Sequence, residues 1–330
     1  MTVVLSDAEV IGLADPDLLY DAARTALIAS ASGAAQAPLR TRLPLAGTDN
    51  RLLVMPGHLR GSALATKVIT VCPGNRARNR SLVGGVVVVT DPANGDVLAI
   101  MAAGALTGLR TAAASAVAAR TLARPDVAVL AVVGAGVQGR AHVRAMAHLY
   151  ALREVRLCSR RAEMAEAAAR ELAPRIGADM RVTATPEDAV RDADLVVTAT
   201  TASDPVVRGS WVAEGAHVCA VGAASPNHRE LDTAVLRRAS VIATDTREGA
   251  LAEAGDLMMP IAAGELAADR VVEVGEILRD SAKGRQAPEE VTVFKSVGLA
   301  AVDAAVAGAL YGAAVRQGVG TAIDLSGGRP

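Results

Sequence analysis

Hydrophobic residues in the second half of the chain follow two alternating patterns. Short continuous runs of Val, Ala, Leu and Ile are typical of strands buried on both faces of a parallel sheet, and stretches with helical periodicity lie between them. Strands and helices that alternate at this spacing predict a doubly wound parallel sheet, the Rossmann arrangement. The predicted strands are 127–133, 154–159, 194–200, 217–222 and 240–244, and the predicted helices are 140–152, 162–176 and 233–238, the last with Asp232 as N-cap.

The N-terminal third shows a different pattern. A helix is predicted from Pro16 to about Ser32, with Asp15 as its N-cap. Segments rich in β-forming residues follow, and the turn sequence DPANGD predicts an antiparallel hairpin between two of them. These strands are 51–55, 64–71, 83–90 and 97–102, with the turn at 91–96.

The last part of the chain contains one long Ala-rich helical pattern, at 296–315, which we expect to return to the N-terminal part. We therefore predict an α/β protein with a Rossmann domain and a second, α+β domain that is discontinuous in sequence. The expected boundaries are 1–118 for the first part of the α+β domain, 119–298 for the Rossmann domain, and 299–330 for the returning helix. A chain of 330 residues is long enough for two cores.

Composition and charge narrow the class of function. The net charge is −1, and Lys and Arg are scattered along the sequence. The sequence therefore does not predict the basic surface that a nucleic-acid-binding protein needs. One Trp, one Phe and three Tyr leave little for base stacking. The N-terminus lacks the features of a signal peptide, and the apolar runs are too short to cross a bilayer. We expect a cytoplasmic enzyme with neither a nucleic-acid nor a membrane partner.

A glycine-rich motif follows the first strand of the predicted Rossmann domain. In a G-x-G-x-x-G motif the first glycine permits a tight turn, the second lets the backbone approach a pyrophosphate, and the third allows close packing of helix on strand. The helix N-terminus then presents N–H groups to the phosphates. The motif predicts dinucleotide binding by Gly134, Ala135, Gly136, Val137, Gln138 and Gly139.

The end of the second strand bears on the choice between NAD and NADP. An Asp or Glu there would hold the ribose 2′-OH of NAD, but this chain has Ser159, Arg160 and Arg161 instead. Two guanidinium groups and a hydroxyl suit a 2′-phosphate, so NADP(H) is favoured over NAD(H). The alternative is a pair of solvated surface arginines.

Several further motifs follow one another along most of the chain. They are PLRT at 38–41 with VMPG at 54–57, ATK at 65–67, TGLRTAA at 107–113, the glycine-rich loop, TATTASDP at 198–205, AVGAASPNHRELD at 220–232 and TVFKSVG at 292–298. In their order and spacing these motifs resemble the ornithine cyclodeaminase and mu-crystallin family. The resemblance implies a homodimer whose N-terminal domain supplies both the subunit contacts and the substrate pocket.

The resemblance also implies that Arg40, Lys67 and Arg110 bind the substrate. Two guanidinium groups and one ammonium suit the clamping of an α-carboxylate. Arg110 is the one charged residue in 101–119, where a buried charge needs a partner. Each residue also has an ordinary alternative, a structural ion pair for Arg110 and Arg40 and a lysine at a sheet edge for Lys67.

The resemblance places further residues at the cofactor. Ser296 and Gly298 would line the nicotinamide pocket, whereas Lys295 is expected to be a solvated charge without a role. Hydroxyls after the strand at 194–200 either reach the cofactor ribose or cap the turn. The remaining candidates for cofactor binding are Thr198, Thr200, Ser203, Val221 and Gly222.

The reaction is the least determined feature. Cyclodeaminases of the family resemble G-x-D-x-P-G-K-x-E-L, in which the Asp serves the amine, but the Asp position here is Ala224, whose methyl group carries no proton. His228 or Glu230 either replaces that acid or lies at the surface, with Glu230 paired to an arginine. The isolated histidines and cysteines predict no metal site.

We therefore expect NADPH-dependent reduction of a C=N bond in an α-imino acid, such as a cyclic ketimine carboxylate. In this hypothesis Lys67 also keeps the imine nitrogen protonated. Alternatives are an ornithine or lysine cyclodeaminase, an alanine-type amino acid dehydrogenase, and a crystallin-like protein that retains NADP(H) without turnover.

Overall fold

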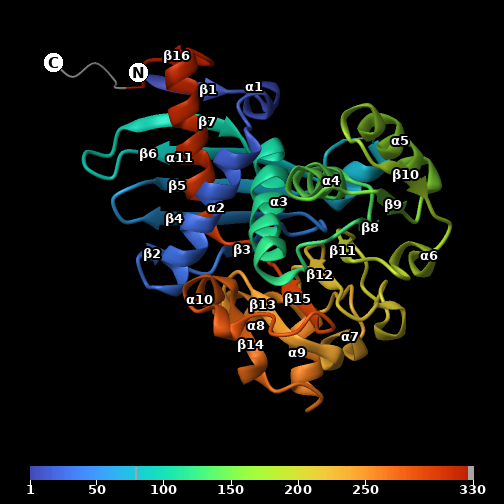
Figure 1. Cartoon of the computed structure of the whole chain (residues 1–330). Coiled ribbons are helices and arrows are strands. Elements are labelled where there is room, and N and C mark those ends of the chain that lie inside the picture. The colour runs from blue at the N-terminus through green and yellow to red at the C-terminus, as the bar shows by residue number, and fades with distance from the viewer. Residues whose placement is uncertain (79, 326–330) are drawn as a thin grey trace. The chain divides into compact units, whose positions relative to one another are not determined.

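The computed structural model describes residues 1–78 and 80–325, and the chain divides into two compact units. Unit 1 comprises Met1–Arg110 and Leu299–Pro330, and unit 2 comprises Thr111–Gly298 (Figure 1). The first boundary lies within helix α3 (Ala103–Leu122), and the second lies just before helix α11 (Ala300–Gln317). Unit 1 is thus discontinuous in sequence.

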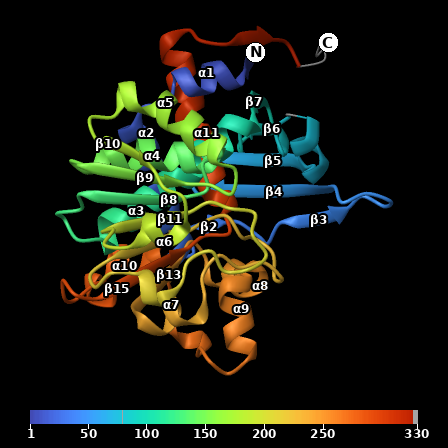
Figure 2. The same cartoon turned by 90° about the vertical axis from the view of Figure 1, so that its right-hand side faces the viewer.

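Unit 2 contains a parallel sheet of eight strands in the order β10-β9-β8-β11-β12-β15-β13-β14. The first strand of unit 2, β8, lies in the middle of this sheet, and the strand order reverses between β8 and β11, as in a Rossmann fold. Figure 2 shows β9, β8 and β11 side by side. The strands are β8 (Val129–Val133), β9 (Glu154–Cys158), β10 (Asp179–Val182), β11 (Leu195–Thr198), β12 (His217–Ala220), β13 (Ala239–Thr244), β14 (Val271–Glu273) and β15 (Val291–Lys295).

Helices follow most of these strands, and the predicted doubly wound arrangement is confirmed. The Asp232 carboxylate caps α7, since it accepts a hydrogen bond from the Val235 N–H at 3.0 Å. The helices of unit 2 are α4 (Val137–Leu149), α5 (Ala162–Leu172), α6 (Pro186–Val190), α7 (Thr233–Arg238), α8 (Arg247–Glu253), α9 (Gly255–Ala262) and α10 (Val274–Arg279).

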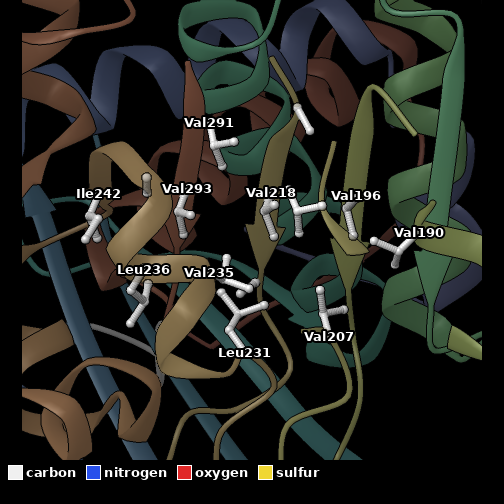
Figure 3. Packing of buried hydrophobic residues seen from close by; sticks show 14 of the residues in the cluster. Val190, Val196, Val207, Val218, Leu231, Val235, Leu236, Ile242, Val291 and Val293 are labelled. Carbon is white, nitrogen blue, oxygen red and sulfur yellow. The ribbon is translucent and has the colours of Figure 1, made fainter. Parts of the chain in front are cut away.

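The core of unit 2 explains why its inner strands are mostly apolar. Val196, Val218 and Val293 come from neighbouring strands, and Val235 and Leu236 of α7 pack against the same cluster (Figure 3). All five side chains are fully buried. Because the sheet is parallel and helices cover it, its inner strands β8, β11 and β12 are buried at every position. The outer strands β9 and β10 keep polar residues that are partly exposed.

Unit 1 is a mixed sheet in the order β16-β1-β7-β6-β5-β4-β2, with β3 also paired to β4. Helix α11 packs on strands β4, β5 and β6 and on helix α2, so the C-terminal helix does return to the N-terminal part (Figure 1). The remaining elements are β1 (Thr2–Leu5), α1 (Asp7–Gly12), α2 (Pro16–Ala31), β2 (Ala35–Gln36), β3 (Thr41–Pro44), β4 (Arg51–Leu59), β5 (Leu64–Val71), β6 (Val83–Thr90), β7 (Val97–Ala102) and β16 (Thr321–Ile323).

The returning helix begins later than the Ala-rich pattern predicts. Residues 296–299 are not helical, because Gly298 has a φ of 91°, outside the helical range, and its N–H is bonded to the Asp245 carboxylate. The predicted start at Ser296 is therefore wrong, and the helix starts at Ala300.

Among the residues that the structure describes, no helix is both long and apolar enough to cross a bilayer.

Candidate active site

Lys67 occupies the middle of the unit 1 sheet. It lies on β5, an inner strand between β4 and β6, and its residue is only 1% exposed. It shares the face of the sheet on which Ala65 and Ile69 are buried, and α11 packs on this strand. The alternative of a solvent-reaching lysine at a sheet edge is therefore wrong.

The partner of Lys67 is Asp303, an acid that the sequence analysis overlooked. The Lys67 ammonium lies 2.8 Å from both carboxylate oxygens, Oδ1 and Oδ2. Asp303 is in the first turn of α11, where the helix dipole favours a negative charge. Because 236 residues separate the two in sequence, only the return of α11 brings them together.

Arg110 of α3 reaches the same carboxylate. Its Nε lies 3.0 Å from Oδ1 of Asp303, and the Arg110 side chain is 7% exposed. No side chain that the structure describes accepts a hydrogen bond from the two Nη nitrogens of Arg110, which form the fork suited to a carboxylate. The two predicted substrate cations, Lys67 and Arg110, therefore meet at one buried acid.

Close packing at Gly57 allows this meeting. Gly57 on β4 pairs with Ala65 of β5, next to Lys67 in the sheet. A Cβ atom at Gly57 would overlap the backbone of Ala300, the first residue of α11. Only glycine permits the start of the helix, and hence Asp303, to lie so close to the sheet.

Arg40 joins the group from a neighbouring segment. It directly precedes β3, whose first residue Thr41 pairs with Val54, while Met55 pairs with Lys67. Register thus places Arg40 beside the row that contains Lys67, and its charge acts on the Lys67 ammonium. Lys67 and Arg110 share the single carboxylate of Asp303, which leaves an excess of positive charge that an anionic ligand would neutralise.

The excess charge weakens the hold of Lys67 on its proton. Burial and the charge of Arg110 lower the pKa of Lys67 from 10.5 to about 7, and Asp303 opposes this shift. Lys67 is thus both a cation that attracts a carboxylate and a group able to exchange a proton near neutral pH.

The glycine-rich loop of unit 2 has the geometry of a dinucleotide cradle. Gly134 has a φ of 111°, and a Cβ at this position would overlap the backbone of Ala199. A Cβ at Gly139 would overlap Gly134, which fits close packing of α4 on β8. By contrast, a Cβ at Gly136 would have nothing within 4 Å, so a phosphate has room to approach. These residues fit a dinucleotide.

The N-terminus of α4 completes the cradle. The helix begins at Val137, followed by Gln138, and no side chain caps it at Gly136, an arrangement suited to phosphate binding. Ala135 is buried in the turn. The Gly134 N–H donates to Cys158 at the end of β9, which brings the segment starting at Ser159 to the same edge of the sheet.

The two arginines after β9 differ in their contacts. Arg161 lies 3.7 Å from Glu163, both well exposed. Arg160 is exposed and has no acidic partner in the part of the chain that the structure describes. Ser159 is half-buried beside them.

The hydroxyls after β11 have separate environments. The hydroxyl of Thr198 is buried and has no hydrogen-bond partner among the described residues. Thr200 donates its hydroxyl to Glu230 at 2.8 Å, so it secures the turn, and the Ser203 hydroxyl donates to Asp204. The sequence left these roles open, and for Thr200 the geometry favours the turn.

Glu230 holds the loops that follow β11 and β12. Its carboxylate accepts hydrogen bonds from the N–H groups of Thr200, Gly222 and Ala223, besides the Thr200 hydroxyl. Glu230 is fully buried, and burial raises its pKa. The expected surface Glu paired to an arginine is therefore wrong. Val221, beside Gly222, donates its N–H to the carbonyl of Thr198 and ties the two loops together.

Lys295 was also expected at the surface, and this expectation is wrong. The residue ends β15, is fully buried, and its ammonium lies 2.8 Å from Oδ2 of Asp256. Oδ1 of Asp256 in turn accepts from the N–H groups of Glu230 and Leu231. The buried Lys295–Asp256 ion pair thus holds the backbone at Glu230, and the Glu230 carboxylate holds the loops at the carboxyl end of the sheet.

Ser296 and Gly298 form a turn secured by another buried acid. Asp245, at the end of β13, accepts from the Ser296 hydroxyl and from the Gly298 N–H, each at 2.7 Å. The turn lies at the carboxyl ends of β13 and β15, the edge at which ligands bind in open α/β sheets.

The position of the cyclodeaminase Asp and the two candidates to replace it have different environments. Ala224 packs against the apolar cluster of unit 2, and His228 is exposed. Both carboxylate oxygens of Glu230 already accept hydrogen bonds from the loops. Across residues 1–78 and 80–325, three or more His, Cys, Asp and Glu side chains nowhere gather as a metal site would need.

Comparisons with known proteins find relatives over most of the chain. A model of the ornithine cyclodeaminase/mu-crystallin family matches residues 1–318. Delta(1)-pyrroline-2-carboxylate reductase of Bacillus cereus is 38% identical over 87% of this chain and 89% of that protein. Ketimine reductase mu-crystallin of Mus musculus is 38% identical over 84% of this chain and 85% of that protein.

A solved structure is similar over nearly the whole chain. The Delta(1)-pyrroline-2-carboxylate reductase of Thermococcus litoralis, in complex with NADH and L-proline, superposes with a TM-score of 0.94. It is 33% identical, and the match covers 98% of this chain and 100% of that chain.

Proposed function

Because this chain belongs to the ornithine cyclodeaminase/mu-crystallin family, we propose that it is an NAD(P)H-dependent imino acid reductase. It reduces the C=N bond of a cyclic ketimine carboxylate, such as pyrroline-2-carboxylate or piperideine-2-carboxylate, to the amino acid. The observation that carries the proposal is the buried group of Lys67, Arg110 and Asp303, whose excess positive charge suits an α-carboxylate. The reductase names of its relatives support the same reaction.

The substrate carboxylate binds to the cations of unit 1. The Nη fork of Arg110 takes it in a bidentate arrangement, and Arg40 and Lys67 add charge. Holding the carboxylate fixes the adjacent C=N carbon, which removes most of the orientational freedom of the substrate.

Lys67 controls the proton of the reaction. An iminium accepts hydride far better than a neutral imine, and the Lys67 ammonium supplies the proton to the nitrogen. When bound, reduced nicotinamide supplies the hydride to the carbon. The product therefore gains one hydride and one proton, and Lys67 regains its proton from water. A pKa of about 7 suits this exchange at neutral pH.

The cofactor binds to unit 2 at the glycine-rich loop. The turn at Gly134–Gly139 and the N-terminus of α4 hold the pyrophosphate, while the turn at Ser296 and Gly298 lies by the nicotinamide. Glu230 and Lys295 act indirectly, because they hold the loops in place.

The absence of an acid at position 224 favours simple reduction over cyclodeamination. Ornithine conversion needs a group to serve the second amine, and the methyl of Ala224 cannot accept a proton or pair with an ammonium. Ammonia release from ornithine without net NADPH oxidation would instead support the cyclodeaminase.

The first prediction concerns Arg110. Purified protein should oxidise NADPH when given pyrroline-2-carboxylate or piperideine-2-carboxylate, and Arg110→Ala should lower kcat/KM on the order of 100-fold, because the carboxylate is no longer held. Arg120→Ala, an exposed arginine on the same helix, is the control and should match the wild type. Equal rates for both variants would exclude the clamp, and no imine reduction by the wild type would exclude the function.

We also propose that NADPH is preferred to NADH. The support is local: Arg160, exposed and without an acidic partner, follows the strand at which NAD enzymes place an acid. The Thermococcus relative was solved with NADH, so the proposed preference for NADPH rests on this chain's own residues alone.

The second prediction follows from Arg160. Arg160→Ala combined with Arg161→Ala should weaken NADPH binding by about tenfold or more, because charge-assisted hydrogen bonds to the 2′-phosphate are lost, and leave NADH binding unchanged. Titration of cofactor fluorescence measures both. Arg170→Ala, exposed on α5, controls for loss of surface charge. Equal weakening for both cofactors, or none, would rule out the assignment.

We propose, third, that the protein is a homodimer that pairs through the unit 1 sheet. Helix α11 packs on one face, and the opposite face carries the partly exposed apolar residues Leu52, Val54, Val68, Val86 and Val88. Val86 is 39% exposed. Sedimentation equilibrium should give twice the chain mass of 33.5 kDa, and Val68→Glu with Val86→Glu should give a monomer. A wild-type monomer at micromolar concentration would refute the proposal.

A further inference from the structure

Asp303 has a geometry that the clamp alone does not require. An acid that touches the substrate-binding cations competes with the substrate carboxylate for them. Yet Asp303 is 1% exposed, and its two oxygens contact Lys67 on one side and Nε of Arg110 on the other. We therefore expect Asp303 to have a function that outweighs its competition with the substrate carboxylate.

We propose that Asp303 is a positioning residue of the reduction, which holds Lys67 as an ammonium aimed at the substrate and turns the Nη fork of Arg110 toward the carboxylate. The inference rests on the proposed function. It assigns a role to a residue that contacts neither substrate nor cofactor but contacts both groups that bind the substrate.

The first support is geometric. The Lys67 ammonium lies 2.8 Å from both oxygens of Asp303, so a flexible four-carbon side chain is fixed at one place. The Nε of Arg110 lies 3.0 Å from Oδ1 of the acid, so the ion pair holds this edge of the guanidinium against Asp303.

The second support is the balance of charge around Lys67. Arg110 from α3 and Arg40 from the segment before β3 both oppose its ammonium, and Asp303 from α11 is the acid that favours it. The neighbouring strands place Met55 and Val87 beside Lys67, and neither titrates. Without Asp303, a fully buried ammonium would face two cations, and the pKa of Lys67 would fall below about 7.

The third support is the close packing and the sequence pattern around this contact. Gly57 has no room for a side chain because the start of α11 lies against it, and that start carries Asp303. Asp303 is the one charged residue between Lys295 and Arg316. An acid in such an apolar helix is retained only where it meets a counter-charge.

The test compares pH profiles of imine reduction for the wild type, Asp303→Asn and Asp303→Glu. In the wild type, kcat/KM should fall as pH rises through about 7, because the free enzyme loses the Lys67 proton. In Asp303→Asn this decline should move to lower pH by about one unit or more. At pH 6, its kcat should fall at least about tenfold, with KM no higher than in the wild type.

Asp303→Glu keeps the charge but displaces it by one methylene. Its decline should stay at the wild-type pH while kcat falls by about tenfold, because the ammonium is misplaced. This variant decides the matter if Asp303→Asn does not fold. Asp49→Asn, exposed in the same unit, controls for the loss of one acid and should behave as the wild type.

The free substrate imine has the same pKa whichever variant is assayed. Differences between the pH profiles of the variants therefore report on the enzyme and not on the substrate. An Asp303→Asn profile that coincides with the wild type, or an Asp303→Glu enzyme with wild-type kcat, would overturn the role of Asp303. If the wild type itself reduces no imine, the proposed function fails, and the positioning role fails with it.

Discussion

The three-way contact of Lys67, Asp303 and Arg110 is the interaction on which the rest of unit 1 depends. Two buried cations without a counter-charge would be costly, and one carboxylate shared between them reduces that cost without removing the excess positive charge. The sheet register, the glycine at position 57 and the return of α11 all serve to bring these groups together. A carboxylate substrate would complete the balance of charge.

Unit 2 uses buried charge in a different way. Glu230 and Asp256 do not leave charge for a ligand, because their oxygens are occupied by loop N–H groups and by Lys295. Their effect is to fix the loops at the carboxyl ends of the strands, where a dinucleotide binds in this fold. The buried ions of unit 1 thus leave positive charge for an anionic ligand, whereas those of unit 2 hold the backbone of the loops in one conformation.

Much of the fold could be predicted from the sequence, since its strands are either continuous apolar runs or clear β-forming segments. The predicted strand at 64–71 has the bounds of β5, and Asp15 and Asp232 cap the helices as expected. Helix α3 was missed because it is rich in Ala and apolar on nearly every side, so no amphipathic period marks it. Short strands such as β1 and β16 owe their existence to pairing partners distant in sequence.

The site residues that could be predicted are those that belong to a local sequence motif. The glycine-rich loop and the three cations have such motifs, whereas the acids that hold them do not. A signal for Asp303 did exist, because it is a lone acid in an Ala-rich stretch, just as Arg110 is a lone cation in another. A lone acid and a lone cation in two apolar stretches are expected to pair with each other, because a buried charge needs a counter-charge. Nothing local indicates that Glu230 and Lys295 are buried, because their partners come from other loops.

The central claim, that Lys67 is a buried cation whose proton is held near neutral pH by Asp303 against two arginines, can be measured directly. The chain has three lysines, Lys67, Lys283 and Lys295, so NMR of protein labelled with 13C at the lysine ε carbons gives a simple spectrum, and Lys67→Met assigns the signal of interest. The account predicts that Lys67 titrates with a midpoint near 7, and that pyrrole-2-carboxylate, a planar carboxylate analogue, raises this midpoint. A Lys67 midpoint near 10.5 that the carboxylate leaves unmoved would contradict it.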